Sequence, residues 1–90
     1  MDYTQNKATE HKSLDDVLMH HLEEEMEDAC EYARLAEEYP VDEKDFWMIG
    51  LEEVTHARHL KMLLERHGHH LSDEHVAKWH RIMHKYGLEK

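Results

Sequence analysis

The segment GLEEVTHARHL, residues 50–60, places two glutamates and two histidines inside a stretch whose spacing otherwise predicts a helix with an apolar stripe. Residues spaced alternately by three and four face the same side of a helix. On this helix the series runs through positions 46, 49, 53, 56, 60, 63 and 67, which hold Phe, Ile, Glu, His, Leu, Leu and His. Glu53 and His56 therefore occupy the two central positions of the expected core stripe. Their i, i+3 spacing puts both side chains on one face.

The segment upstream carries a similar stripe with one charged residue in it. Positions 18, 22, 25, 29, 32, 36 and 39 hold Leu, Leu, Glu, Ala, Tyr, Ala and Tyr, so Glu25 is the single ionisable exception. Pro40 cannot continue a helix and restricts the residue before it. The pattern predicts one helix over residues 14–39, capped by Ser13, and a second over 43–67, capped by Asp42 and ended by Gly68.

A third, shorter helix is predicted after the turn HGHHL, residues 67–71. Ser72 is its expected N-cap, Gly87 ends it, and its apolar face is made by Val76, Trp79, Met83 and Tyr86. Strand-like alternation is absent from the sequence. We therefore expect a flexible arm over 1–12 and one all-α domain over 13–90, built as an antiparallel two-helix hairpin plus a short third helix.

The small size of the chain indicates that the hairpin does not act alone. The chain has 90 residues, of which 40% are hydrophobic and 36% are charged. A domain of this size is near the lower limit for a self-sufficient core, and oligomerisation or a bound metal is the usual remedy. Two hairpins packed together bury both apolar stripes in a four-helix bundle. We expect at least a homodimer.

Charge and composition exclude several classes of partner. With 21 acidic and 11 basic residues, the net charge is −10, which disfavours nucleic acid and attracts cations. No run of about 18 apolar residues exists, and MDYTQNKATEHK at the start has no apolar signal core, so we expect no membrane span and a cytoplasmic location. Cys30 is the single cysteine, which excludes an intrachain disulfide, and it is expected to be inert unless two chains bring their cysteines together.

The three ionisable residues in the stripes predict a metal site. A buried carboxylate without a partner costs several kcal/mol, so Glu25, Glu53 and His56 need one another or a cation. The alternatives are a Glu–His hydrogen-bonded cluster, or a stripe rotated so that Glu53 is exposed. Two hairpins supply two glutamates and two Glu-x-x-His pairs, which is the ligand set of di-iron carboxylate bundles. Iron is the expected metal, with Zn, Mn or Ca as substitutes.

Two segments resemble the ferritin-like superfamily: EEEMEDACEYARLAEE, residues 23–38, and EEVTHARHL, residues 52–60. The spacing of Glu25 and Tyr32 is similar to helix 1 of rubrerythrin-type bundles. Glu-x-x-His-Ala-x-x-Leu, from Glu53 to Leu60, is similar to helix 2. A single such half in about 90 residues is most similar to the encapsulated ferritins, half-ferritins whose hairpins dimerise to build a ferroxidase centre. The resemblance covers about residues 14–66.

The resemblance implies specific roles for residues. Glu25, Glu53 and His56 of each chain are the implied iron ligands, although a different loop geometry would put Asp28 or Glu24 in place of Glu25. Glu24 and Glu27 match acids that handle entering metal; the alternative is solvated helix surface. Tyr32 lies beside the centre in this interpretation, or else is a packing residue.

The implied function is that of a ferroxidase, which oxidises Fe(II) to Fe(III) with O2 or peroxide for iron storage or detoxification. Family members form annular assemblies of dimers, and cargo members carry a C-terminal extension that directs them into an encapsulin nanocompartment. The segment HKYGLEK, residues 84–90, shows no such extension. Three alternatives remain: a non-catalytic metal-binding bundle, a rubrerythrin-like peroxidase that uses an external electron donor, and a hairpin that only mediates interactions.

The remaining histidines and tryptophans have less specific interpretations. The histidines near the second turn form either a secondary metal site or a solvated group; they are His67, His69, His70 and His75. His20 and His21 are expected on the helix surface, and Trp47 and Trp79 are expected to be packing anchors.

Overall fold

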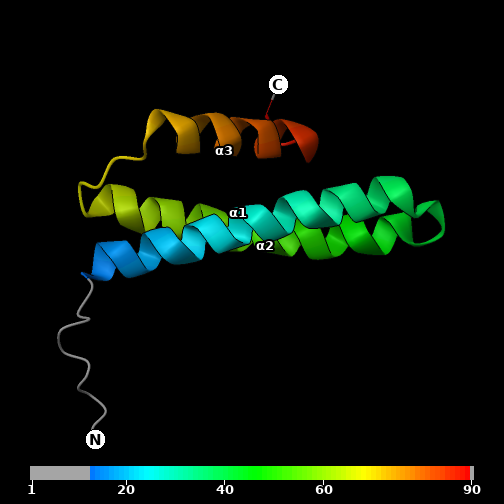
Figure 1. Cartoon of the computed structure of the whole chain (residues 1–90), viewed down its shortest axis with the longest axis horizontal. Coiled ribbons are helices and arrows are strands. Elements are labelled where there is room, and N and C mark those ends of the chain that lie inside the picture. Colours follow the sequence, from blue (N-terminus) through cyan, green and yellow to red (C-terminus); the bar gives the residue numbers. More distant parts are fainter. Residues whose placement is uncertain (1–12, 90) are drawn as a thin grey trace, which may run out of the picture.

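A computed structural model describes residues 13–89 of the chain. The regular elements in this range are α1 (Leu14–Glu38), the short 3-10 helix η2 (Pro40–Asp42), α2 (Glu43–Arg66) and α3 (Asp73–Lys85). α1 and α2 run antiparallel as a hairpin, and α3 lies across one of its faces (Figure 1). The predicted all-α fold is confirmed for the described residues, whereas the predicted arm over 1–12 lies outside them. None of the described helices has the length and apolar character needed to cross a membrane.

Serine caps begin two of the three long helices as predicted. Ser13 Oγ accepts a hydrogen bond from the backbone N–H of Asp16 at 3.1 Å, and Ser72 Oγ accepts one from the backbone N–H of His75 at 3.1 Å. The capping role predicted for Asp42 is wrong, because its side chain makes no cap hydrogen bond. Asp42 ends η2 with φ −106° and ψ 17°, so the chain enters α2 directly from a helical turn rather than from the extended conformation that a capping side chain needs.

Glycine reverses the chain after α2. Gly68 has φ 77°, a left-handed conformation that favours glycine, and the N–H of His69 donates to the carbonyl of Leu64 at 2.9 Å. This backbone bond satisfies a carbonyl in the last turn of α2. The predicted end of the second helix at Gly68 is therefore confirmed, with His67 as its C-cap.

The core lies where small residues on α1 and α2 face each other beneath α3. Its buried residues on α1 are Leu22, Met26, Ala29, Ala33 and Ala36, those on α2 are Val54, Ala57 and Leu64, and those on α3 are Trp79, Ile82 and Met83. Gly50 is also buried on α2. The α1 and α2 contributions to this core include three alanines of α1, Ala57 and Gly50, while α3 contributes larger apolar side chains.

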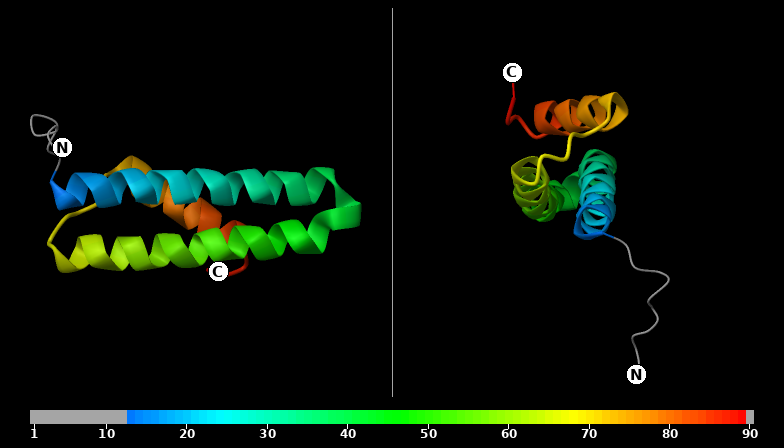
Figure 2. Two further views of the ribbon diagram at one scale, coloured as in Figure 1. Left: turned by 90° about the horizontal axis from the view of Figure 1, so that it is seen from below. Right: turned by 90° about the vertical axis from the view of Figure 1, so that its left-hand side faces the viewer.

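The core stripe on α2 is rotated relative to the predicted one. Gly50, Val54 and Ala57 are buried, whereas Ile49 is 38% exposed and the side chain of His56 is 61% exposed. The central core positions predicted for Glu53 and His56 are therefore wrong for the single chain. The physical reason is that α3 packs on one side of the hairpin and draws the core toward that side. The opposite face is not covered by any described element (Figure 2).

A tyrosine near the end of α3 fixes this helix to the hairpin. The hydroxyl of Tyr86 donates to the carbonyl of Ala29 at 2.6 Å, and its ring meets that of Trp47 edge-on at 5.1 Å between centroids. A Cβ atom added at Gly50 would lie 1.9 Å from Tyr86 Oη. The absence of a side chain at Gly50 therefore lets Tyr86 pack directly against α2. The packing role predicted for Trp47 and Trp79 is confirmed, because Trp47 contacts Tyr86 and Trp79 is buried in the core.

Candidate metal centre

Glu25 from α1 and Glu53 and His56 from α2 converge on the face of the hairpin away from α3. One ligand atom from each residue lies within 4.8 Å of the other two. His56 Nδ1 is 3.7 Å from Glu25 Oε1 and 3.6 Å from Glu53 Oε1. The i, i+3 spacing of Glu53 and His56 places both on the same side of α2, and the antiparallel pairing of the helices brings Glu25 opposite them.

The three side chains differ in their contact with solvent. The side chains of Glu25 and Glu53 are 23% and 22% exposed, whereas that of His56 is 61% exposed. The carboxyl groups therefore lie at the edge of the hairpin interior, and the imidazole stands at its open side. The position of Glu53 thus lies between the predicted core position and the alternative of a rotated stripe that exposes it, since its side chain is neither fully buried nor on the open surface.

The two carboxyl groups interact unfavourably when both are ionised. The pKa of Glu53 is raised above its usual value of 4.5, first by hydrogen bonding with Glu25, then by burial and by the charge of Glu25, while His56 acts in the opposite direction. Among the described residues, Glu25 Oε1 is buried and has no hydrogen-bond partner when both groups are carboxylates. A buried acceptor without a donor is costly, so this oxygen requires either a proton on Glu53 or a cation.

The donor set suits a divalent transition metal. Two carboxylates and one imidazole are ligands for iron, manganese and zinc, and the unpartnered Glu25 Oε1 is an atom that a cation would satisfy. Three protein ligands leave coordination positions open, as metal sites that carry out chemistry require. His56 is exposed on the uncovered face, so a further ligand could reach the three side chains from that side. The residues present therefore fit a metal ion that they would hold with part of its coordination shell.

The structure selects Glu25 over its sequence neighbours. Glu24 and Asp28 are both exposed and lie outside the converging group. The carboxylate of Glu24 is instead 3.3 Å from His20 Nε2 and 3.7 Å from His21 Nδ1 on the surface of α1. The surface location predicted for both histidines is confirmed.

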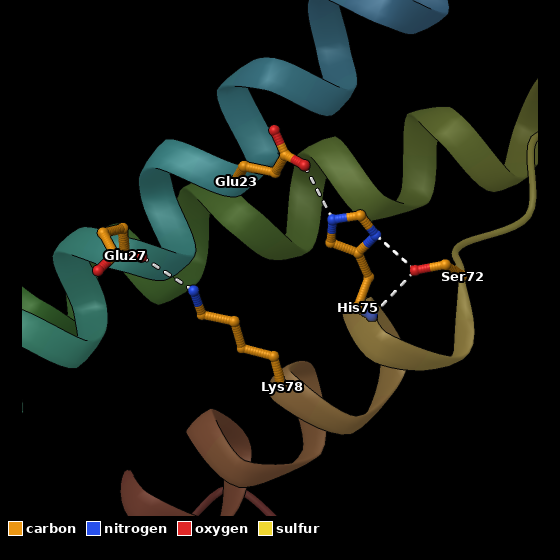
Figure 3. A network of polar contacts seen from close by, with 5 residues as sticks. All are labelled: Glu23, Glu27, Ser72, His75 and Lys78. Atoms are coloured by element: carbon orange, nitrogen blue, oxygen red, sulfur yellow. Dashed lines mark hydrogen bonds and ion pairs between the residues drawn. The ribbon is translucent and has the colours of Figure 1, made fainter.

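Glu27 points toward α3 rather than toward Glu25, Glu53 and His56. Its Oε1 accepts a hydrogen bond from Lys78 Nζ at 2.9 Å (Figure 3). One turn away, Glu23 accepts from Nε2 of His75 at 2.9 Å, and His75 Nδ1 lies 2.8 Å from the Ser72 hydroxyl. These contacts dock α3 on α1. The structure thus does not pair Glu24 with Glu27, and a role for either acid in metal uptake stays a prediction.

The structure also bears on the alternatives given for Tyr32 and for the four histidines near the second turn. The ring of Tyr32 lies 6.3 Å from that of Phe46, which fits the packing interpretation. The four histidines of the second turn do not gather at one point: His75 contacts α1 at Glu23, whereas His67 and His69 approach Asp15.

Tyr86 has a perturbed ionisation that the sequence did not reveal. Burial raises the pKa of its phenol to about 12, with smaller contributions from the charges of Cys30 and Glu53. The sequence indicated only that Tyr86 belongs to the apolar face of the third helix. Its burial depends on the crossing of α3 over the hairpin, which no local pattern specifies.

A scan against protein-family models, a search of curated proteins and a search of solved structures give no match to this chain. The likeness to ferritin-like proteins therefore depends on the residues quoted above from the sequence, together with the convergence of the three side chains.

Proposed function

We propose that two copies of this chain combine their Glu25, Glu53 and His56 side chains into a di-iron centre that oxidises Fe(II) to Fe(III), in the manner of the half-ferritins that the sequence resembles. One observation supports this proposal most directly: Glu25 Oε1 is buried without a hydrogen-bond partner among the described residues, and ligand atoms of Glu25, Glu53 and His56 lie within 4.8 Å of one another. An apolar side chain at position 25 would give a more stable helix pair than a buried carboxylate does, so stability alone does not explain Glu25.

The residues one heptad before and after each ligand support a second hairpin as the missing partner. All six of these positions are apolar: Leu18 and Tyr32 flank Glu25, Phe46 and Leu60 flank Glu53, and Ile49 and Leu63 flank His56. None of them is fully buried in the single chain. A second copy packed on this face would bury this apolar seam and add a second set of three ligands. The metal centre would then lie midway along a four-helix bundle.

The chain's own groups account for the selectivity and direction of the reaction. The net charge of −10 draws Fe(II) toward the protein. Carboxylate oxygens are hard ligands and favour Fe(III) over Fe(II), whereas the His56 imidazole is a neutral ligand that also suits Fe(II). Two Fe(II) ions each give up one electron, and O2 takes up these two electrons and two protons to become hydrogen peroxide. Such a reaction would serve iron storage or detoxification.

The test is Fe(II) oxidation followed by stopped-flow absorbance at the wavelengths of Fe(III). Glu25→Ala, Glu53→Ala and His56→Ala should each remove most of the protein-dependent rate. Glu52→Ala is the matched control, because Glu52 is an exposed glutamate on the same turn of α2 and lies outside the group. Equal rates in all four variants would place the chemistry elsewhere. Tight Zn(II) or Mn(II) binding without Fe(II)-dependent O2 uptake would instead identify a non-catalytic metal bundle.

A further inference from the structure

The carboxylate of Asp15 lies between two imidazoles at the end of the hairpin opposite η2. Asp15 Oδ1 accepts a hydrogen bond from His67 Nδ1 at 2.8 Å, and Asp15 Oδ2 lies 3.8 Å from His69 Nδ1. Each of the three side chains is about one third exposed. Asp15 and Glu25 are ten residues apart on α1, which corresponds to about 15 Å along the helix axis. This group is therefore separate from the candidate iron centre.

The backbone at the end of α2 explains why both imidazoles face one carboxylate. His67 is the C-cap of α2, and Gly68 follows in the left-handed conformation with φ 77°. The chain then folds back so that the N–H of His69 donates to the carbonyl of Leu64 at 2.9 Å. This turn puts His67 and His69 on the same side of the chain, next to the first turn of α1. Because α1 and α2 are antiparallel, Asp15 in the first turn of α1 lies beside the end of α2.

Two imidazole nitrogens and one carboxylate oxygen form a recognised ligand set for divalent metals. Such sets hold zinc or iron with the remaining positions open to water, and partial exposure of all three residues gives water access here. A metal ion would take the place of the proton now shared between His67 and Asp15. The two nitrogens approach opposite oxygens of Asp15 and are less closely grouped than the ligands around Glu25. Rotation of the partly exposed imidazoles would complete the convergence.

We propose that Asp15, His67 and His69 form a second metal site. The site would select divalent transition metals that prefer imidazole ligands, such as Zn2+. The site joins the first turn of α1 to the end of α2, so metal binding there closes the end of the hairpin that no loop connects. This inference does not depend on the proposed ferroxidase activity.

The experiment uses the full chain with the first centre removed by Glu25→Gln, Glu53→Gln and His56→Gln. Zn2+ is titrated by isothermal calorimetry, and circular dichroism at each step verifies that the helices are retained. We expect one tight equivalent of Zn2+ in this background. Adding His67→Gln and His69→Gln, or Asp15→Asn alone, should weaken that equivalent by roughly tenfold or more. His70→Gln is the matched control in the same turn, because no ion pair involves His70 among the described residues; it should leave the affinity unchanged.

Nitrogen-15 NMR of labelled histidine distinguishes this site from adventitious binding to a chain with eleven histidines. The proposal expects the first equivalent of Zn2+ to shift Nδ1 of His67 and His69 before any other imidazole nitrogen. Equal shifts across all histidines would overturn it. Unchanged Zn2+ affinity in the His67→Gln, His69→Gln variant would also overturn it. That result would show that Asp15 and the two histidines only make hydrogen bonds and ion pairs that join α1 to the end of α2.

Discussion

Glu25 and Glu53 bring two carboxyl groups together from different helices, and Glu25 Oε1 is buried without a hydrogen-bond partner within residues 13–89. Their proximity raises the pKa of Glu53, first through the hydrogen bond that a protonated Glu53 makes with Glu25. In the absence of metal, this pair destabilises the folded chain when both groups are ionised. Each ionised carboxylate therefore lowers the stability of the metal-free protein but would favour the binding of a cation.

Replacing Glu53 by Gln should therefore stabilise the metal-free protein at pH 7. The glutamine amide supplies a permanent donor near Glu25 and removes one of the two charges, an effect of about 1 kcal/mol. The same substitution should abolish Fe(II) oxidation. Chemical denaturation with and without a chelator measures the first effect, and stopped-flow absorbance measures the second. Glu52→Gln, on the exposed neighbour, should change neither quantity.

The contribution of Glu53 to the stability of the metal-free protein should fall as the pH rises from acid toward neutrality. The folded chain holds the Glu53 proton more tightly than the unfolded chain, whose pKa is near 4.5. The resulting stabilisation is fully present below pH 4.5 and is lost as the pH rises through the higher pKa of the folded state. Denaturation curves at a series of pH values measure this trend, as a difference between wild type and Glu53→Gln. If the two proteins show the same pH dependence, the carboxyl pair has no such coupling.

Fe(II) should shift the chain toward a dimer. Metal that binds only the paired state stabilises it by mass action. Size-exclusion chromatography with light scattering, run anaerobically with and without Fe(II), measures the shift. Ile49→Asp should weaken the dimer, because Ile49 belongs to the apolar seam and is 38% exposed in the single chain. Met48→Asp is the matched control on a different face of α2. A chain that stays monomeric with ample iron would contradict a shared site.

The contact between Gly50 and Tyr86 should appear as a coupling between two substitutions. Gly50→Ala gains about 1 kcal/mol of helix propensity but places a methyl group 1.9 Å from Tyr86 Oη, so the net result should be a loss of roughly 1–2 kcal/mol. Tyr86→Phe removes the hydroxyl and its bond to Ala29, at about 1 kcal/mol. In the Tyr86→Phe background, Gly50→Ala should cost less. Additive losses in a double-mutant cycle would show that Tyr86 moves away from Gly50 freely.

Alkaline conditions should loosen α3. Burial raises the pKa of Tyr86 to about 12 from a usual value of 10.0, so the folded chain holds this proton more tightly than the unfolded chain. The contribution of Tyr86 to stability is fully present below pH 10 and is lost as the pH rises toward 12. Thermal unfolding followed between these pH values should show a steeper decline for wild type than for Tyr86→Phe.

The helix caps should differ in their contributions to stability. Ser72→Ala should cost about 1 kcal/mol, since the Ser72 hydroxyl caps α3 and also contacts His75. Asp42→Ala should cost much less, because Asp42 makes no cap hydrogen bond. Urea denaturation of the two variants provides the comparison. A larger loss for Asp42→Ala would mean that its charge, rather than a hydrogen bond, stabilises the start of α2.

Local sequence patterns predict the helices, their serine and glycine boundaries, and the three residues that converge. These features depend on interactions between residues a few positions apart, such as the serine caps, Gly68 and the spacing of Glu53 and His56. Which side of the hairpin becomes the core depends on how distant segments pack. α3 crosses one face and fixes Tyr86 over Gly50, which buries Val54 and Ala57 and leaves Ile49 and His56 exposed. Burial depends on packing between distant segments, and a periodic pattern with apolar residues on both sides does not specify which side α3 will cover.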